Sequence, residues 1–428
     1  MKELTKYGVT ERLLVFLIGA VQFVNILDFM MVMPLGPDFA RALDIPLSKL
    51  GLVGGSYTLA AAVAGLVGSL FLDRFDRRSA LALCMAGLVL GTFAGGFATG
   101  LRSLLAARVL AGLFGGPATS LSLSIIADAV PVQRRGKALG AVMGAFSMAQ
   151  VLGVPASLRV SEWAGWRAPF FAVAGLGLLI TAGTITLLPP MRDHLTAVTD
   201  RAAAVPLFRR TVLQSYAMTA VAMGAGFLLI PNLSAYVQGN LGFPRSSLWK
   251  LYGAGGVLSF ITLRLVGKLV DRFGSFRVGT TGSLLMLLAI WLIFIDVPIN
   301  PPVLLLFLFF LFALSVRNVA YSTLTSKVPK PAERARFMSF QSAVQHLASA
   351  AGAIVSSFVL AQGSGGRLLH MPRLGALSLL LVATFPVWLW LVERAVDRDA
   401  SAPLPPTLET HAELGPRPDG MARPLKKV

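Results

Sequence analysis

The sequence predicts an all-α membrane protein with twelve transmembrane helices arranged as two pseudo-symmetric six-helix bundles. Two observations predict this fold. The chain is 55% hydrophobic and 14% charged, with a mean hydropathy of +0.72, which is too apolar for a water-soluble surface. The tripeptide Asp-Arg-Phe also occurs twice, and Val130-Pro131 and Val328-Pro329 recur at the same offset. Two landmarks repeated at one spacing indicate a chain built from two similar halves.

The helices are expected where apolar runs reach about 18 residues, the length that crosses a bilayer. The first run is too long for a cleaved signal peptide. Six runs precede the polar segment 191–211 and six follow it. The expected spans are 13–35, 50–72, 79–99, 103–127, 137–160, 168–189, 212–235, 248–270, 278–297, 301–325, 336–361 and 373–393.

This pattern divides the chain into four parts. A first bundle is expected at 1–190, a cytoplasmic connecting loop at 191–211, a second bundle at 212–395 and a tail at 396–428. The tail holds several prolines and charges but few large apolar residues. Because it cannot bury enough apolar surface to offset the entropy of ordering, we expect it to be disordered.

The distribution of charge predicts the orientation. The chain carries a net charge of +18, a value that also occurs in nucleic-acid-binding proteins. The loops on the side of the two termini hold about twice as many Lys and Arg residues as the loops on the other side, which is the asymmetry of inner-membrane proteins. We therefore expect both termini in the cytoplasm of a bacterial cell. Binding to nucleic acid is excluded, because it needs basic residues gathered on one soluble face.

One acidic residue lies well inside a predicted helix. Asp28 follows Gln22 and Asn25 at helical spacing, and Arg108 lies at a similar depth, roughly 10 Å from the same side of the membrane. A charge in lipid costs several kcal/mol unless it is paired or hydrated. Each of the two residues therefore needs a partner or contact with water.

Other polar residues lie within the second half. Arg317 is close to Tyr321, and we expect it either to contact an anionic or polar substrate or to be buried for structural reasons. A polar face on the eleventh helix must avoid lipid, so we expect it to line the substrate pathway; the alternative for its histidine is a packing role. With Asn25, the candidate pathway residues are Arg317, Tyr321, Gln341, Gln345 and His346.

The repeated tripeptide carries a family resemblance. Ser69-Leu-Phe-Leu-Asp73-Arg74-Phe-Asp-Arg77-Arg78 resembles the loop between helices two and three of the major facilitator superfamily, whose pattern is Gly-x-x-x-Asp-Arg-x-Gly-Arg-Arg. The second copy, Gly267-Lys-Leu-Val-Asp271-Arg272-Phe-Gly274, keeps both glycines of that pattern, whereas Ser69 and Asp76 replace them in the first.

The resemblance implies a gate on the cytoplasmic side. A carboxylate at a helix end can face the N-terminus of a helix from the other half, where free N–H groups and the helix dipole favour negative charge. Asp73 is expected near 334–338 and Asp271 near 136–140. The alternative is that these charges only set the topology. The candidate gating residues are Asp73, Arg74, Arg77, Arg78, Asp271 and Arg272.

Two further motifs resemble those of the family. In the fourth helix, Gly112 and Gly116 follow Arg108 at intervals of four residues, and such small residues on one helix face would let helix backbones approach closely. In the fifth, Gly153-Val154-Pro155 resembles the Gly-Pro signature of antiporters, although Val154 interrupts it. Pro155 is expected to bend or loosen this helix.

The run from Val21 to Leu35 resembles bacterial arabinose-efflux and drug-export permeases. The family fold places helices one and four at a central cavity, so the resemblance implies that Asp28 and Arg108 pair and couple transport to protons. The alternatives are a static ion pair or an aspartate in a wet vestibule. The implied function is a proton-coupled antiporter that exports a drug, sugar or metabolite by alternating access.

Two other functions remain open. Three intramembrane arginines against one aspartate favour a proton symporter or exchanger for a small organic anion. A non-transporting membrane receptor or scaffold is the second alternative, but no appended soluble sensor domain supports it. We expect a monomer in the lipid bilayer, with protons and a small-molecule substrate as its partners. We expect no enzymatic activity, and no cofactor or metal, because no cluster of His, Cys and carboxylates has metal-ligand spacing.

Overall fold

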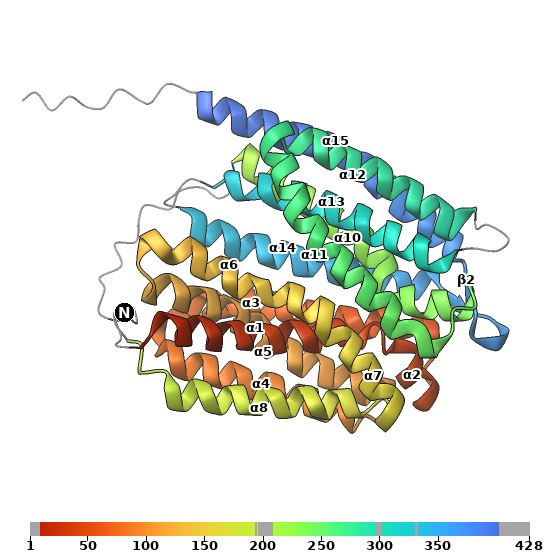
Figure 1. Ribbon diagram of the computed structural model, residues 1–428, viewed down its shortest axis with the longest axis horizontal. Helices are drawn as coiled ribbons and strands as arrows, with labels where there is room; N and C mark the ends of the chain where they lie inside the picture. The colour runs from red at the N-terminus through yellow and green to blue at the C-terminus, as the bar shows by residue number, and fades with distance from the viewer. Residues whose placement is uncertain (1–8, 193–194, 196–208, 297–301, 330–332, 402–428) are drawn as a thin grey trace, which may run out of the picture.

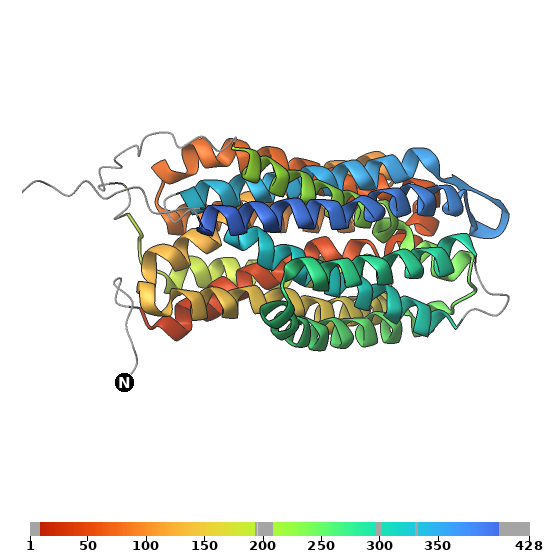
Figure 2. The same cartoon turned by 90° about the horizontal axis from the view of Figure 1, so that it is seen from above.

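The computed structural model describes residues 9–192, 195, 209–296, 302–329 and 333–401. Twelve helices in these ranges are long and apolar enough to cross a membrane. They run roughly along one axis of the molecule and form two groups, as Figures 1 and 2 show. The predicted fold class is confirmed.

The first bundle contains the first six spans. Its helices are α1 (Glu11–Val32), α3 (Leu50–Phe71), α4 (Arg77–Gly96), α5 (Leu101–Ala129), α6 (Val132–Met148) with α7 (Val154–Ala164), and α8 (Ala168–Leu187). The second bundle repeats the arrangement with α10 (Arg210–Gly239), α11 (Leu248–Phe273), α12 (Ser275–Ile290), α13 (Val303–Lys327), α14 (Arg334–Val359) and α15 (Met371–Ser401).

The two ends of the molecule differ. We call the end that holds Glu11 and Ser401 the termini face and the opposite end the distal face (Figure 1). The distal face is covered by short elements, which are the helix α2 (Gly36–Ala42), the 3-10 turns Leu47–Lys49 and Arg245–Ser247, and an antiparallel pair of strands, β1 (Ala361–Gln362) and β2 (Leu368–Leu369).

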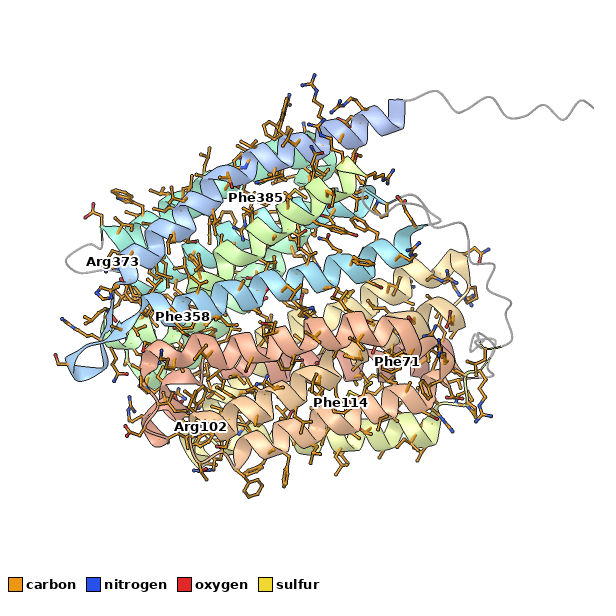
Figure 3. All side chains as sticks on the ribbon, turned by 180° about the vertical axis from the view of Figure 1, so that it is seen from behind. Phe71, Arg102, Phe114, Phe358, Arg373 and Phe385 are labelled. Atoms are coloured by element: carbon orange, nitrogen blue, oxygen red, sulfur yellow. The ribbon has the colours of Figure 1, made fainter. Side chains whose placement is uncertain are left out.

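The side chains on the outside of the bundles are those of a protein in lipid. Phe16, Leu179 and Phe358 are 71%, 71% and 76% exposed, and side chains project outward along the whole length of the helices (Figure 3). Such apolar exposure would cause aggregation in water, whereas in a bilayer these side chains contact lipid tails.

Several helices differ from the predicted spans, and the ninth span ends in a π-helical turn at Trp291–Ile295. The fifth span is interrupted by a π-helical turn at Ala149–Gly153, and α7 then begins with Pro155 near its start. Because proline lacks an N–H group and clashes with the preceding turn, the local loosening agrees with the role expected of Pro155.

The last helix continues to Ser401, so the prediction of disorder from residue 396 was wrong for its first six residues. The chain emerges from the apolar span into a segment rich in charged residues. Because several of these residues are good helix formers, the helix extends past the apolar span. Residues 402–428 and most of the connecting segment, 193–194 and 196–208, lie outside the described ranges.

Candidate functional site

A buried ion pair lies inside the first bundle. Arg108 of α5 donates through Nη1 to both carboxylate oxygens of Asp28 of α1, at 2.9 and 3.0 Å, and Thr92 of α4 donates to the same carboxylate at 2.8 Å. The two charged side chains are 1% and 0% exposed. The structure therefore brings together the two residues that the sequence singled out, in a setting where an unpaired charge would be costly.

Tyr57 of α3 separates this ion pair from the centre of the molecule. Its ring centroid lies 4.7 Å from the guanidinium carbon of Arg108, and its hydroxyl donates to Asn25 Oδ1 at 2.7 Å. Gly115 makes this arrangement possible, because a Cβ there would lie 2.3 Å from the tyrosine oxygen. Sequence analysis missed Tyr57, although a lone tyrosine in a helix rich in glycine and alanine is a detectable signal.

A central cavity of about 90 Å³ lies on the other side of this wall. Its first-bundle side comes from α1, α3 and α5, and one residue of α14, His346, faces them from the second bundle. Because both bundles contribute, a molecule bound in this cavity would sense their relative movement. The lining residues are Asn25, Ile26, Phe29, Tyr57, Thr58, Gly115, Gly116, Thr119 and His346.

The polar face of α14 does not act as one surface. His346 lines the cavity, and its Nδ1 lies 2.9 Å from the carbonyl oxygen of Ser342 one turn earlier. Gln341 is buried and donates to Thr219 of α10 inside the second bundle. Gln345 is exposed. Of the three residues predicted to line the pathway on this helix, the structure places one at the cavity.

Arg317 and Tyr321 of α13 lie within the second bundle and are not among the residues that line the cavity. Arg317 is 0% exposed and donates to the Ala222 carbonyl oxygen at 2.9 Å, while its guanidinium lies 5.5 Å from the Phe385 ring centroid. Contact between Arg317 and a substrate therefore requires a rearrangement of the second bundle, and in this conformation its contacts are structural.

The predicted gating residues divide between the two bundles. Arg77 pairs with Asp128 of α5 at 3.3 Å, and Arg78 donates to the Leu188 carbonyl oxygen at 3.2 Å, so both bind within the first bundle. Arg74 is exposed. The side chain of Asp73 lies outside what the structure describes.

The contact expected between Asp271 and the start of α6 belongs to a closed cytoplasmic side and is not made in this conformation, so it stays a prediction. Asp271 and Arg272 are exposed, and nothing lies within 4 Å of where a Cβ would project at Gly136 or Gly140. The reason is visible in Figure 1, where α6 and α11 diverge toward the termini face.

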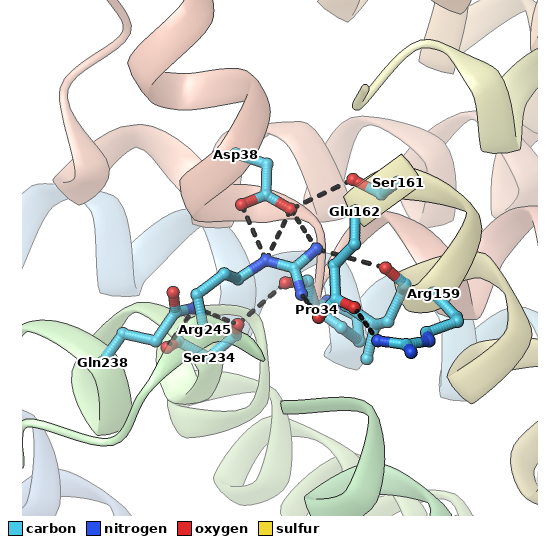
Figure 4. A network of polar contacts seen from close by, with 9 residues as sticks. Pro34, Asp38, Arg159, Ser161, Glu162, Ser234, Gln238 and Arg245 are labelled. Atoms are coloured by element: carbon cyan, nitrogen blue, oxygen red, sulfur yellow. Dashed lines mark hydrogen bonds and ion pairs between the residues drawn. The ribbon is translucent and has the colours of Figure 1, made fainter. Parts of the chain in front are cut away.

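On the distal face, an ion-pair network joins the two bundles (Figure 4). Arg245, just before α11, donates to Asp38 of α2 at 2.6 and 2.9 Å and to Glu162 of α7 at 3.4 Å. Ser234 of α10 also donates to the Pro34 carbonyl oxygen at 2.8 Å. We call Asp38, Glu162 and Arg245 the distal latch. Its members come from three separate short elements, α2, α7 and the 3-10 turn before α11, so their pairing could not be read from the sequence.

The predicted packing glycines allow close helix contact. A Cβ at Gly112 would lie 2.3 Å from the Tyr57 carbonyl oxygen, and one at Gly116 would lie 2.4 Å from that of Ala61. Gly153 lies against Leu27 of α1, where a Cβ would approach to 2.7 Å. These positions therefore hold α5 against α3, and the π-helical turn against α1, at distances that a side chain would prevent.

Asp76 caps the start of α4 on the termini face. Its carboxylate accepts from the backbone N–H of Ser79 and of Met191, each at 3.1 Å, and from Arg192 at 3.2 Å. Partial burial acts to raise the pKa of this carboxyl, but the hydrogen bonds from Ser79, Arg192 and Met191 outweigh it, so the pKa lies below its usual value.

We predict that Asp76→Ala lowers the free energy of unfolding by about 1–2 kcal/mol at pH 7, since an N-cap is lost. A carboxyl with a lowered pKa stabilises the fold above its ordinary pKa, and that contribution is lost as the pH falls through the lowered value. The difference between the wild type and Asp76→Ala should therefore shrink below pH of about 4. Thermal unfolding in detergent at pH 7 and pH 3 tests this, and a difference that grows in acid would contradict it.

Within the described residues, no group of three or more His, Cys, Asp or Glu side chains is arranged to hold a metal ion.

Comparison with known proteins agrees with this architecture. The model of the Major Facilitator Superfamily matches residues 18–353 and, in a second match, residues 265–420. The inner membrane transport protein YdhP of Escherichia coli (strain K12) is 30% identical over 261 residues, which are 60% of this chain and 66% of that protein. The chloramphenicol resistance protein of Streptomyces lividans is 28% identical over 361 residues, which cover 82% of this chain and 90% of that protein.

Solved structures share the fold. A bacterial homologue of the human lysosomal transporter Spinster, in an inward-facing and unoccupied conformation, superposes with a TM-score of 0.72 at 16% identity, covering 92% of this chain and 99% of that one. A D-xylose–proton symporter gives a TM-score of 0.68 at 19% identity, covering 88% and 96%. At these identities the likeness is one of fold.

Proposed function

The chain belongs to the Major Facilitator Superfamily, and we propose that it is a proton-coupled antiporter that exports a small organic molecule across the bacterial inner membrane. The observation that carries this proposal is the fully buried pair of Asp28 and Arg108. A carboxylate that leaves its guanidinium in a dry site binds a proton, and one that regains it releases the proton. In this account Asp28 carries the proton and Arg108 controls its release.

The position of the pair supports coupling to a substrate. Tyr57 and Asn25 both line the central cavity, and Tyr57 contacts both the Arg108 guanidinium and the Asn25 side chain. A substrate that packs against these wall residues and holds them in place would keep the ion pair together, which favours the deprotonated carboxylate of Asp28. Binding and protonation would then oppose each other, as antiport requires.

The orientation is part of the proposal. The excess of Lys and Arg on the termini face supports a cytoplasmic location for that face. The distal latch would then close the periplasmic side while α6 and α11 stand apart on the cytoplasmic side. Transport would alternate between this state and one in which the latch is broken and the termini face is closed, with the two Asp-Arg-Phe loops contributing to that closure.

The first probe for transport is chloramphenicol, because a relative that is 28% identical over 82% of this chain is a chloramphenicol resistance protein. Chloramphenicol is neutral and therefore does not itself distribute with a pH gradient. It combines an aromatic ring with hydroxyl and amide groups, which suits a cavity lined by Phe29, Tyr57 and small polar side chains.

We predict that proteoliposomes with an acidic interior take up chloramphenicol at several times the initial rate of vesicles treated with nigericin, since outward proton flow would drive inward exchange. Empty liposomes give the background. Faster uptake with an acidic exterior would instead support symport, and uptake of an organic anion under that condition would favour the alternative of an anion symporter. Uptake that is indifferent to the gradient would contradict proton coupling.

A further inference from the structure

The hydrogen-bond donors in the wall of the central cavity are already used within the protein. The Asn25 amide has two N–H bonds, and they reach the Gly115 carbonyl oxygen and Thr119 Oγ1, each at 2.8 Å. The Tyr57 hydroxyl donates to Asn25 Oδ1 at 2.7 Å. These partners also fix the orientation of the amide, because the Gly115 carbonyl can only accept a hydrogen bond.

The hydroxyl groups of the two threonines that line the cavity also donate within the protein. Thr58 donates to the Gly55 carbonyl oxygen at 3.1 Å, and Thr119 donates to that of Gly115 at 3.2 Å. Both bonds run back along the helix that carries the threonine. Neither hydroxyl hydrogen is therefore free for a ligand without loss of an internal bond.

His346 contributes an acceptor from the second bundle. Its Nδ1 lies 2.9 Å from the Ser342 carbonyl oxygen and 3.4 Å from the Ser342 hydroxyl. The shorter contact is to a group that can only accept, and we therefore assign the hydrogen to Nδ1. In the neutral ring this leaves Nε2 with a lone pair and no hydrogen. Among the described residues, Nε2 has no hydrogen-bond partner.

The side chains that line the cavity therefore leave hydrogen-bond acceptors available to a ligand, whereas their hydrogen-bond donors are already bound within the protein. Lone pairs remain on Asn25 Oδ1, Tyr57 Oη, Thr119 Oγ1 and His346 Nε2, whose residues line the cavity together with Phe29. The two buried arginines do not change this balance. Arg108 is bound to Asp28 behind Tyr57, and Arg317 is 0% exposed inside the second bundle.

We infer that this cavity selects molecules that donate hydrogen bonds through hydroxyl, amide or ammonium groups on an aromatic or apolar body, and that it rejects organic anions. His346 is the specificity-determining residue of the second bundle. A carboxylate would bring only further acceptors and would leave its charge without a partner. As a statement about which molecules are transported, this inference rests on the proposed function. The selectivity of binding to the cavity does not depend on it.

Four single-ring probes test the inference at pH 8, where imidazole is neutral. Benzyl alcohol and anisole have the same formula, but only the alcohol donates, and benzylammonium and benzoate contrast a donor cation with an acceptor anion. Binding is measured by ligand-observed NMR on the full-length protein in detergent, with empty micelles subtracted. We expect the donor of each pair to bind about tenfold more tightly than its partner.

His346→Leu should reduce the preference for benzyl alcohol over anisole to less than about threefold, whereas His346→Gln should keep it, because the amide oxygen accepts. Gln345→Leu, on the exposed neighbour, is the matched control and should change nothing. Tighter binding of benzoate than of benzylammonium, an unchanged preference in His346→Leu, or no binding of any probe would overturn the inference. These measurements need no gradient, so they can fail or succeed independently of proton-coupled export.

Discussion

Replacing Arg108 by Gln should lower the free energy of unfolding by about 3–5 kcal/mol, the cost of leaving a buried charge without its partner. Asp28, which is 0% exposed in the wild type, could then become neutral only by binding a proton. Asp28→Asn leaves the opposite charge unpaired and should be destabilising for the same reason. The measurement is thermal or denaturant unfolding of the purified protein in detergent.

The double variant Asp28→Asn/Arg108→Gln distinguishes pairing from packing. If the two charges stabilise each other, the double variant should be more stable than the sum of the single losses predicts, by at least about 2 kcal/mol. Arg264→Gln is the matched control, because this exposed arginine lies over the Phe260 ring at 4.4 Å; its loss should cost less than about 1 kcal/mol. Strictly additive losses for Asp28 and Arg108 would contradict the assignment of a coupled pair.

Replacing Arg245 by Gln should open the distal face. This side chain holds Asp38 and Glu162 of the first bundle through charge-assisted hydrogen bonds of 2.6–3.4 Å. Loss of bonds of this kind costs about 2 kcal/mol, or roughly 30-fold in the ratio of the two states. The variant should therefore populate a distal-open state that is rare in the wild type.

Spin labels at Arg102 and Arg373 can report this opening, since both positions are exposed at the same end of the molecule and belong to different bundles (Figure 3). Cys84 is buried, and replacing it by Ser leaves only the two introduced cysteines for labelling. Arg245→Gln should add a longer distance to the distribution measured by pulsed electron resonance. Arg41→Gln, on the short helix α2 that also carries Asp38, is the matched control. An unchanged distribution in Arg245→Gln would show that the latch does not hold the bundles together.

Much of the fold was predictable because each transmembrane helix is encoded locally. A run of about 18 apolar residues crosses the bilayer whatever surrounds it, so the twelve spans and the twofold repeat follow from the sequence. The π-helical turn before Pro155 and the extension of α15 to Ser401 were not predictable in detail. They depend on the backbone geometry of one turn and on charged residues beyond the apolar span.

The site was predictable only in part. Asp28 and Arg108 stand out because an ionic group in lipid demands a partner. Tyr57 and the distal latch depend on which loops and helix faces meet in three dimensions, and periodicity does not determine that. The placement of Gln341 and Arg317 shows the same limit, since a polar residue in a membrane helix can face its own bundle as readily as a central cavity.

The central claim is that Asp28 carries the exchanged proton, and proton release on substrate binding tests it most directly. Chloramphenicol is added to the purified protein in weakly buffered detergent solution, and a pH-sensitive dye counts the protons released while binding is measured in parallel. We predict release of up to about one proton per molecule of wild type and none from Asp28→Asn, which should still bind the probe. Equal release from both proteins, or binding by the wild type without any proton release, would contradict the account.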